Sequence, residues 1–306
     1  MSCAIVSMTT KTSRLHSGEQ GGFALLLVIG VLVLLSLAAA LLAASSDAEI
    51  RMARNRADLA QAQSLADAGV TLSLAWLMDA DDKTRWHADG SAHVLNYGGG
   101  TITVSVQDEG GKVNINAAPL DLIDGLLNEL GVDTDERNTL VAAIDARRQA
   151  FTPQTVFHGI AAFNAPFAAV SELRLLPSVT RRTYDLMRPF VTVYSYSAAI
   201  NPLTAPREVL LGVPGISPQE VEFFLPARNE ASNGQPGAEL PKLSGVDRYV
   251  YIGAVSTVTI TAKAVAASGA SFARAAVVAL GTGSSSNQPY QILEWGQDLD
   301  DRSGQD

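Results

Sequence analysis

Residues 23–44 read FALLLVIGVLVLLSLAAALLAA and contain no charged side chain. A helix of this length extends about 33 Å, which is enough to cross the hydrocarbon core of a membrane. The polar leader before it, residues 1–22, carries Lys11 and Arg14 and ends in Gly21-Gly22. Because positive charges favour the cytoplasmic side, the pattern predicts a single-pass helix with a cytoplasmic N-terminus and an extracytoplasmic remainder.

The position of the small residues relative to this apolar run decides how the chain is processed. A secretory signal peptide is cleaved behind its apolar region, which is then lost. Here Gly22-Phe23 stands in front of it, an arrangement that resembles the leader of type IV pilins and pseudopilins. The resemblance implies that a prepilin peptidase cuts after Gly22, that Phe23 becomes a methylated N-terminus, and that residues 23–44 are kept as a filament-core helix. An ordinary signal anchor is the alternative.

Position five of the mature chain, Leu27, departs from the usual pilin pattern. Most proteins of the class carry a glutamate there, and the resemblance implies that its partner is the N-terminal ammonium of a neighbouring subunit. A carboxylate in lipid is costly unless it is paired. A subunit with no neighbour on that side has no ammonium to pair with, so an apolar residue is less costly there, and the resemblance implies that such a subunit sits at the tip of the filament.

Composition excludes several classes of function. The formal net charge is -9, and removing residues 1–22 leaves about -10. Nucleic-acid binding in general needs a basic face that neutralises phosphates, so this charge argues against it. The single cysteine, Cys3, lies in the leader, which leaves the mature chain without disulfides, cysteine-zinc sites or thiol nucleophiles. The histidines are scattered and no hydrolase or phosphate-loop motif is present, so we do not expect an enzyme.

The rest of the chain predicts an α+β fold. Residues 45–80 have the helical spacing of an amphipathic helix that packs on a sheet. Alternating patterns predict strands at 94–97, 101–107, 255–264 and 271–280. A long helix on an antiparallel sheet is the pilin architecture in outline, with residues 45–116 supplying its helix and first strands. Residues 251–281 then supply the final strands, and residues 282–306 are expected to form a flexible acidic tail.

About 135 residues separate the two halves of this sheet, too many for a structureless loop. Residues 117–250 are therefore expected to form an inserted, all-α domain. Its sequence has a loose repeat in which helices are joined by tight turns, as around Leu130-Gly131-Val132 and Val213-Pro214-Gly215. Side-chain oxygens of Asp133, Thr180 and Ser217 are placed to cap the helices that follow.

These features together resemble one family, the K minor pseudopilins of the type II secretion system. The residues that carry the resemblance are Gly22-Phe23, Leu27, the string Asp108-Glu109-x-Gly-Lys112-x-Asn114-x-Asn116, the triplet Thr204-Ala205-Pro206, and the large helical insertion. The resemblance implies an inner-membrane protein at the pseudopilus tip, with no chemistry of its own. It implies a complex with minor pseudopilins I and J that caps the pseudopilus and starts its assembly in the inner membrane, with the major pseudopilin as a further partner. It further implies contact with secreted protein substrates, export of folded proteins across the outer membrane, and an insertion of sterile-alpha-motif type.

Some members of this family bind calcium in the helical domain, so the resemblance raises the same expectation here. Calcium takes carboxylate and carbonyl oxygens. An acidic cluster in the sequence supplies candidate ligands, but without the spacing of a twelve-residue calcium loop. The alternative is that these side chains cap helices and face solvent. The candidates are Asp121, Asp124, Asp133, Asp135 and Glu136.

A competing interpretation is a minor pilin of a type IV or competence pilus that binds DNA. Residues 211–217, LGVPGIS, open a helix in the manner of a helix-hairpin-helix motif, whose backbone amides hold a phosphate. The helix that follows begins with Pro218-Gln219-Glu220-Val221-Glu222, which is acidic where a phosphate would lie. The charge pattern therefore favours the secretion family over DNA binding.

Overall fold

The computed structural model describes residues 21–81, 84–150, 166–232, 240–243, 245–281 and 288–297. Residues 1–20 of the predicted leader lie outside the described residues, as do residues 282–287 and 298–306 of the predicted tail. By its internal contacts the chain divides into two units, residues 1–57 and residues 58–306.

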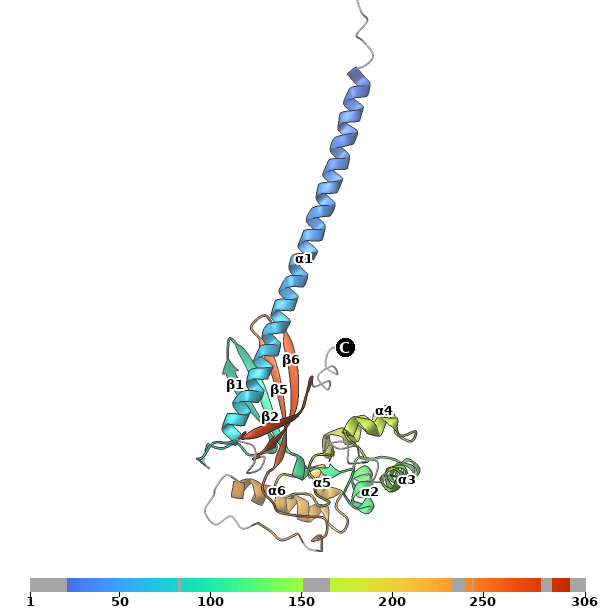
Figure 1. Ribbon diagram of the computed structural model, residues 1–306, viewed down its shortest axis with the longest axis vertical. Helices are drawn as coiled ribbons and strands as arrows, with labels where there is room; N and C mark the ends of the chain where they lie inside the picture. The colour runs from blue at the N-terminus through green and yellow to red at the C-terminus, as the bar shows by residue number, and fades with distance from the viewer. Residues whose placement is uncertain are drawn as a thin grey trace, which may run out of the picture. The chain divides into compact units, whose positions relative to one another are not determined.

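Helix α1 runs from Gly21 to Leu77 without a break (Figure 1). Its segment Phe23–Leu42 has a mean hydropathy of 3.1 and, within the described residues, is the one stretch long and apolar enough to cross a membrane. The side chains of that stretch are exposed. The apolar run 23–44 and the amphipathic continuation predicted over residues 45–80 therefore belong to one helix, which ends at Leu77.

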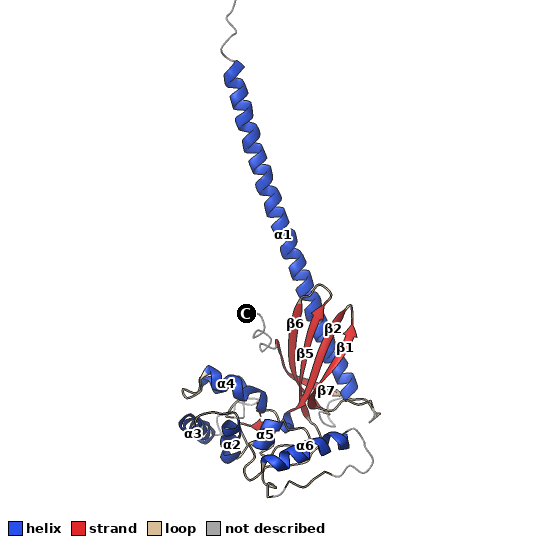
Figure 2. Ribbon diagram, turned by 180° about the vertical axis from the view of Figure 1, so that it is seen from behind, coloured by secondary structure: helices blue, strands red, loops and turns tan. Residues whose placement is uncertain are grey.

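Five antiparallel strands form the main sheet in the order β1-β2-β5-β6-β7. Residues 58–77 of α1 pack on one face of it, and Figure 2 shows the strands running beside this part of the helix. The predicted alternation is confirmed, because Ile102, Val104 and Val106 are fully buried on that face. The bounds are β1 Asp89–Tyr97, β2 Gly100–Asp108, β5 Thr257–Ala266, β6 Ser271–Leu280 and β7 Tyr290–Gln297.

Strand β7 corrects the expectation of a flexible tail over residues 282–306. The flexible tail was expected from the Gly-Ser stretch at 281–286 and from the aspartates after 297. Strand β7 lies between these two stretches in the sequence. Its residues include Tyr290, Ile292 and Trp295, whose types favour strands. Pairing with β6 satisfies backbone groups on that edge of β6, which a solvated tail would have left open.

The chain between β2 and β5 forms the inserted domain, and most of it is helical. Its core includes Val113 and Ile115, so the domain begins a few residues before the predicted position 117. It also holds a short parallel pair, β3 with β4, and is therefore not entirely α. The elements are η1 Glu109–Gly111, β3 Val113–Asn114, α2 Leu120–Glu129, α3 Thr134–Ala150, η4 Val170–Leu175, α4 Arg181–Met187, η5 Arg188–Phe190, β4 Val191–Thr192, α5 Arg207–Leu211 and α6 Pro218–Ser232.

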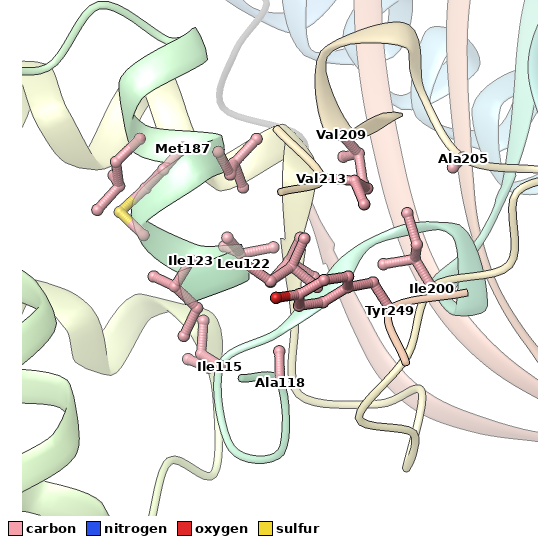
Figure 3. Close-up of a cluster of buried hydrophobic side chains, with 14 of the residues drawn as sticks. Ile115, Ala118, Leu122, Ile123, Met187, Ile200, Ala205, Val209, Val213 and Tyr249 are labelled. Carbon is pink, nitrogen blue, oxygen red and sulfur yellow. The ribbon is translucent and has the colours of Figure 1, made fainter. Parts of the chain in front are cut away.

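The inserted domain has a hydrophobic core separate from that of the sheet. Side chains from α2, α5 and the flanking segments converge there (Figure 3). Leu122 and Leu126 of α2 are fully buried in it. Two predicted caps are confirmed on its helices: the Thr180 hydroxyl accepts from the backbone N–H of Thr183 at 3.1 Å, and that of Ser217 from Glu220 at 3.3 Å. Local hydrogen bonds of this kind are what capping residues supply.

Candidate functional site at the junction of the sheet and the inserted domain

The string Asp108–Asn116 lies where β2 ends and the inserted domain begins. Asp108 is the N-cap of the turn η1, and its carboxylate accepts from the backbone N–H of Gly110 at 2.9 Å. The next glycine, Gly111, passes close to the backbone of Thr204, so that a Cβ there would stand 2.6 Å from the Thr204 carbonyl oxygen. A glycine is therefore required where the two segments touch.

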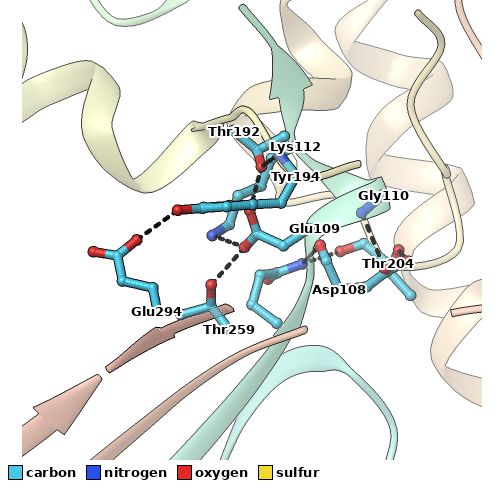
Figure 4. A network of polar contacts seen from close by, with 10 residues as sticks. Asp108, Glu109, Gly110, Lys112, Thr192, Tyr194, Thr204, Thr259 and Glu294 are labelled. Atoms are coloured by element: carbon cyan, nitrogen blue, oxygen red, sulfur yellow. Dashed lines mark hydrogen bonds and ion pairs between the residues drawn. The ribbon is translucent and has the colours of Figure 1, made fainter. Parts of the chain in front are cut away.

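Glu109 is the centre of a buried polar network (Figure 4). Its carboxylate contacts the ammonium of Lys112 at 2.5 Å, and the two side chains are almost completely buried. It also accepts the hydroxyl of Thr259 on β5 at 2.6 Å and the hydroxyl of Thr192 on β4. A buried charge is tolerated when it is paired and its remaining lone pairs are satisfied. The Glu109 carboxylate, which follows β2, thus connects β2 with β5 of the sheet and with β4 of the inserted domain.

Asp108 makes a second tie between the same parts. Its other oxygen accepts from the hydroxyl of Thr204 at 2.8 Å and from the side-chain amide of Asn201 at 3.2 Å. Burial raises the pKa of the Asp108 carboxyl above its usual value of 3.8, and the hydrogen bond from the Gly110 backbone N–H acts against that shift. The acid-rich string is therefore a structural lock rather than a solvated turn.

A third tie reaches the edge strand β7. The Tyr194 hydroxyl donates to the carboxylate of Glu294 at 2.9 Å (Figure 4). Burial, together with the charge of Glu294, raises the pKa of the Tyr194 hydroxyl. Between this contact and the Glu109 network lies a cavity of about 470 Å³, lined also by Phe190 and Thr261. Its lining includes residues of the sheet and residues of the η4–η5 segment.

The structure also resolves the loose repeat of the inserted domain into two equivalent turns. The backbone N–H of Ala118 donates to the carbonyl of Asn114 at 2.8 Å. The same bond recurs 87 residues later in the numbering, from Ala205 to Asn201 at 2.9 Å. A proline follows each alanine and precedes the first helix of each half. Identical spacing and hydrogen bonding make these two halves an internal repeat.

Each half holds its turn with an arginine from its second helix. In both halves the guanidinium donates to two backbone carbonyls of the turn, three residues apart, at 2.7 to 3.1 Å. Arg148 uses Nε and one terminal nitrogen, as a planar guanidinium fork allows, whereas Arg228 makes both bonds from one terminal nitrogen. The sets are Arg148 with Ile115 and Ala118, and Arg228 with Pro202 and Ala205.

The two halves meet at equivalent glycines. Gly125 of α2 and Gly212 at the end of α5 are again 87 residues apart in the numbering. A Cβ built on Gly125 would lie 2.0 Å from the carbonyl oxygen of Gly212, and one built on Gly212 would lie 2.7 Å from the Cα of Leu126. The backbones approach so closely that neither position accepts a side chain.

The calcium candidates on α2 have partners within the protein. Asp121 accepts the hydroxyl of Tyr249 at 2.6 Å and lies 3.5 Å from the guanidinium of Arg248. Asp124 pairs with Arg137 at 3.0 Å. Both carboxylates therefore hold neighbouring segments in place.

The remaining candidates lie at the start of α3. The carboxylate of Asp133 accepts from the backbone N–H of Asp135 at 2.9 Å, as a capping residue does, and Glu136 accepts the hydroxyl of Thr183. Among the residues that the structure describes, no three His, Cys, Asp or Glu side chains form a group that could hold a metal ion. Calcium binding stays a prediction that rests on the family resemblance.

The segment proposed for a DNA phosphate is occupied by carboxylates. The backbone N–H and the hydroxyl of Ser217 both donate to Glu220, at 2.9 and 2.8 Å. Glu222 pairs with Arg207 at 2.5 Å. An anion at this helix start would meet these carboxylates and lose the amide it needs. The geometry therefore disfavours the DNA-binding alternative.

The processing residues lie at the start of α1. Gly22 and Phe23 are in its first turn, and the Phe23 and Leu27 side chains are exposed. Cleavage after Gly22, methylation of Phe23 and the role of Leu27 stay predictions.

Comparison with known proteins gives a family match over the part of the chain that contains the junction. Residues 103–196 match the family described as Type II secretion system (T2SS), protein K. The match includes the whole Asp108–Asn116 string and the first half of the repeat, and it confirms the family resemblance stated from the sequence. No curated protein sequence matches the chain.

A solved structure is also similar, described as the crystal structure of the GspK-GspI-GspJ complex from the enterotoxigenic Escherichia coli type 2 secretion system. The matched chain is 14% identical, with 83% of this chain and 99% of that chain covered, at a TM-score of 0.47.

The sequence identified some of these residues and missed others. Asp108, Glu109, Lys112 and Asn114 were singled out as a family string, although without their roles. Their partners were missed because each belongs to a different segment: Thr192 and Thr259 lie 83 and 150 residues from Glu109. Thr204, which donates to Asp108, was singled out within the family triplet 204–206, also without its role.

Proposed function

We propose that this protein is a minor pseudopilin of the type II secretion system that acts at the tip of the pseudopilus. The observation that carries the proposal is the family match over residues 103–196, centred on the junction that joins the sheet to the inserted domain. The apolar segment Phe23–Leu42 supports a single-pass inner-membrane anchor with a periplasmic C-terminal part. The function is one of assembly, without chemistry of its own.

In this role the protein forms a complex with minor pseudopilins I and J, starts assembly of the major pseudopilin and supports export of folded proteins. The polar ties at Asp108 and Glu109 suit such a task, because they hold the inserted domain to the sheet. The test is genetic: in a host that lacks its own protein K, the intact chain restores secretion. Loss of secretion with normal expression and membrane insertion would contradict the proposal.

Leu27 provides a sharper test of the tip position. Leu27→Glu adds a carboxylate that has no neighbouring ammonium to pair with, so processing is retained but pilus initiation falls. Leu26→Glu places the same carboxylate one residue away and serves as the matched control for the cost of a charge in lipid. Pseudopilus number per cell is the measurement. Unchanged initiation with Leu27→Glu would remove the physical argument for a terminal subunit.

A further inference from the structure

Strand β1 is an edge of the sheet, and within the described residues it is hydrogen-bonded only to β2. The turn between them is Gly98-Gly99, with φ of +57° and +77°, the signs required by the two-residue hairpin turn of type I′. In such a hairpin the flanking pair, Tyr97 and Gly100, bond to each other. By alternation, the backbone N–H and C=O groups of Ala92, Val94 and Asn96 point away from β2.

Asp89 and one register irregularity lie at the start of this edge, and between Gly90 and Tyr97 it lacks the charges and prolines that stop a sheet from pairing with another chain. Residues 90–97 contain no Asp, Glu, Lys, Arg or Pro. The pairing with β2 is regular from Ala92 to Tyr97, after one irregularity near Asp89. The Val94 side chain is 64% exposed. An exposed, regular and uncharged edge is a template for a further strand.

The opposite edge of the same sheet, strand β7, has features that hinder pairing with another strand. Strand β7 carries Glu294 and has an irregularity opposite Val277 and Val278 that breaks its register. Charges and bulges are the means by which proteins blunt an edge. On β7 the charge and the irregularity lie in the middle of the strand, whereas on β1 they lie at its first residues and leave Ala92–Tyr97 uninterrupted.

Aromatic surface accompanies the open edge. Trp86 stacks on His93 of β1, with ring centroids 3.8 Å apart, and on Trp76 of α1 at 6.1 Å. Trp76 is 40% exposed and Tyr97 is 53% exposed. Burial lowers the pKa of His93, so the imidazole is neutral at neutral pH and adds no charge to the strand. Half-exposed aromatic side chains are enriched in interfaces.

We propose that β1 accepts an extended strand from a neighbouring pseudopilin, which continues the sheet by pairing with Ala92, Val94 and Asn96. The inference rests on the proposed function for the identity of the neighbour. The incoming strand is uncharged where it faces Val94 and apolar where it meets the aromatic stack. Its backbone supplies the affinity, and the flanking side chains supply the register.

A second copy of this chain is a poor occupant. Each mature chain carries a net charge of about -10, so two copies brought edge to edge repel each other. A subunit of lower net charge avoids this repulsion.

The test uses the full chain, in detergent, with minor pseudopilins I and J. Val94→Pro removes an N–H that points away from β2, so the hairpin keeps its internal bonds while the edge loses a donor. Val94→Thr, which keeps the N–H and the β-branched shape, is the matched control. We expect Val94→Pro to reduce the recovered complex at least about tenfold, the equivalent of about 1.4 kcal/mol, and Val94→Thr to leave it unchanged.

A folded Val94→Pro chain that forms the complex as the wild type does would overturn the inference. If this variant does not fold, amide exchange of the wild-type peptide covering 90–97 decides: slower exchange in the complex supports strand addition, and unchanged exchange overturns it. A wild-type chain that recovers neither protein I nor protein J would instead contradict the proposed function. The two failures are therefore distinguishable.

Discussion

At the scale of single residues, Glu109 bears the largest structural role. It is 2% exposed and faces Lys112, Thr192 and Thr259 from three different segments. Neutralising it leaves the Lys112 ammonium buried without a counter-charge. We expect Glu109→Gln to lower the free energy of unfolding by about 3 to 5 kcal/mol, measured by urea denaturation of the full chain in detergent.

The control for that variant is Glu230→Gln, which removes a charge from an exposed position on α6. A surface change of this kind alters stability by less than about 0.5 kcal/mol. Equal effects of the two variants would show that the buried network does not stabilise the fold.

Asp108 predicts a pH dependence with a definite sign. Its pKa is raised on folding, so the folded chain binds more protons at this site than the unfolded chain does. The site's contribution to stability is therefore present at low pH and decreases as pH rises through the range above 3.8. Urea denaturation of wild type and Asp108→Asn between about pH 4 and 7 isolates this term. The stability of wild type relative to the variant should decline with pH, and a constant or increasing difference would contradict the assignment.

The sequence predicted side-chain hydrogen bonds between residues a few positions apart, but it did not predict those between residues far apart in the chain. The caps at Thr180 and Ser217 depend on residues three positions away, and both were predicted. The partners of Glu109 depend on the tertiary fold, and periodicity carries no information about them.

At the scale of elements, the repeat of the inserted domain depends on two glycines. Gly125→Ala places a methyl group against the backbone of Gly212, which has no side chain to move aside. Alanine favours a helix over glycine by about 1 kcal/mol, but overpacking against the backbone costs about 1 to 3 kcal/mol or more. We expect a net loss of stability, with a similar loss for Gly212→Ala, measured by thermal unfolding.

Glu129→Ala is the matched control on the same helix, because Glu129 is exposed and the change tests helix propensity alone. If Gly125→Ala raised the unfolding temperature as much as a favourable helix substitution does, the close approach of the two halves would be refuted.

Elements with strong patterns were predicted and weak ones were not. The apolar run and the alternating strands gave α1, β2, β5 and β6 close to their observed bounds. Strand β7 was missed because it lies between low-complexity stretches, and β3 and β4 were not recognised as a pair because two residues each carry no periodicity.

At the scale of the whole molecule, the carboxylates at the junction make the sheet and the inserted domain a connected body. Two hydrophobic cores lie on either side of a polar seam, which Asp108, Glu109 and Tyr194 bridge. The sequence predicted both bodies and their order along the chain. It did not predict the seam, because pairing across it joins residues that lie 83 to 150 positions apart in the sequence.

The central claim is that this chain is a tip subunit that assembles with minor pseudopilins I and J. The most direct measurement is co-purification of the full chain, extracted in detergent, with both candidate proteins. The account predicts a stable complex that contains one copy of each and persists at moderate salt. Absence of that complex, together with salt-sensitive retention of DNA, would contradict the account and favour a competence-type pilus.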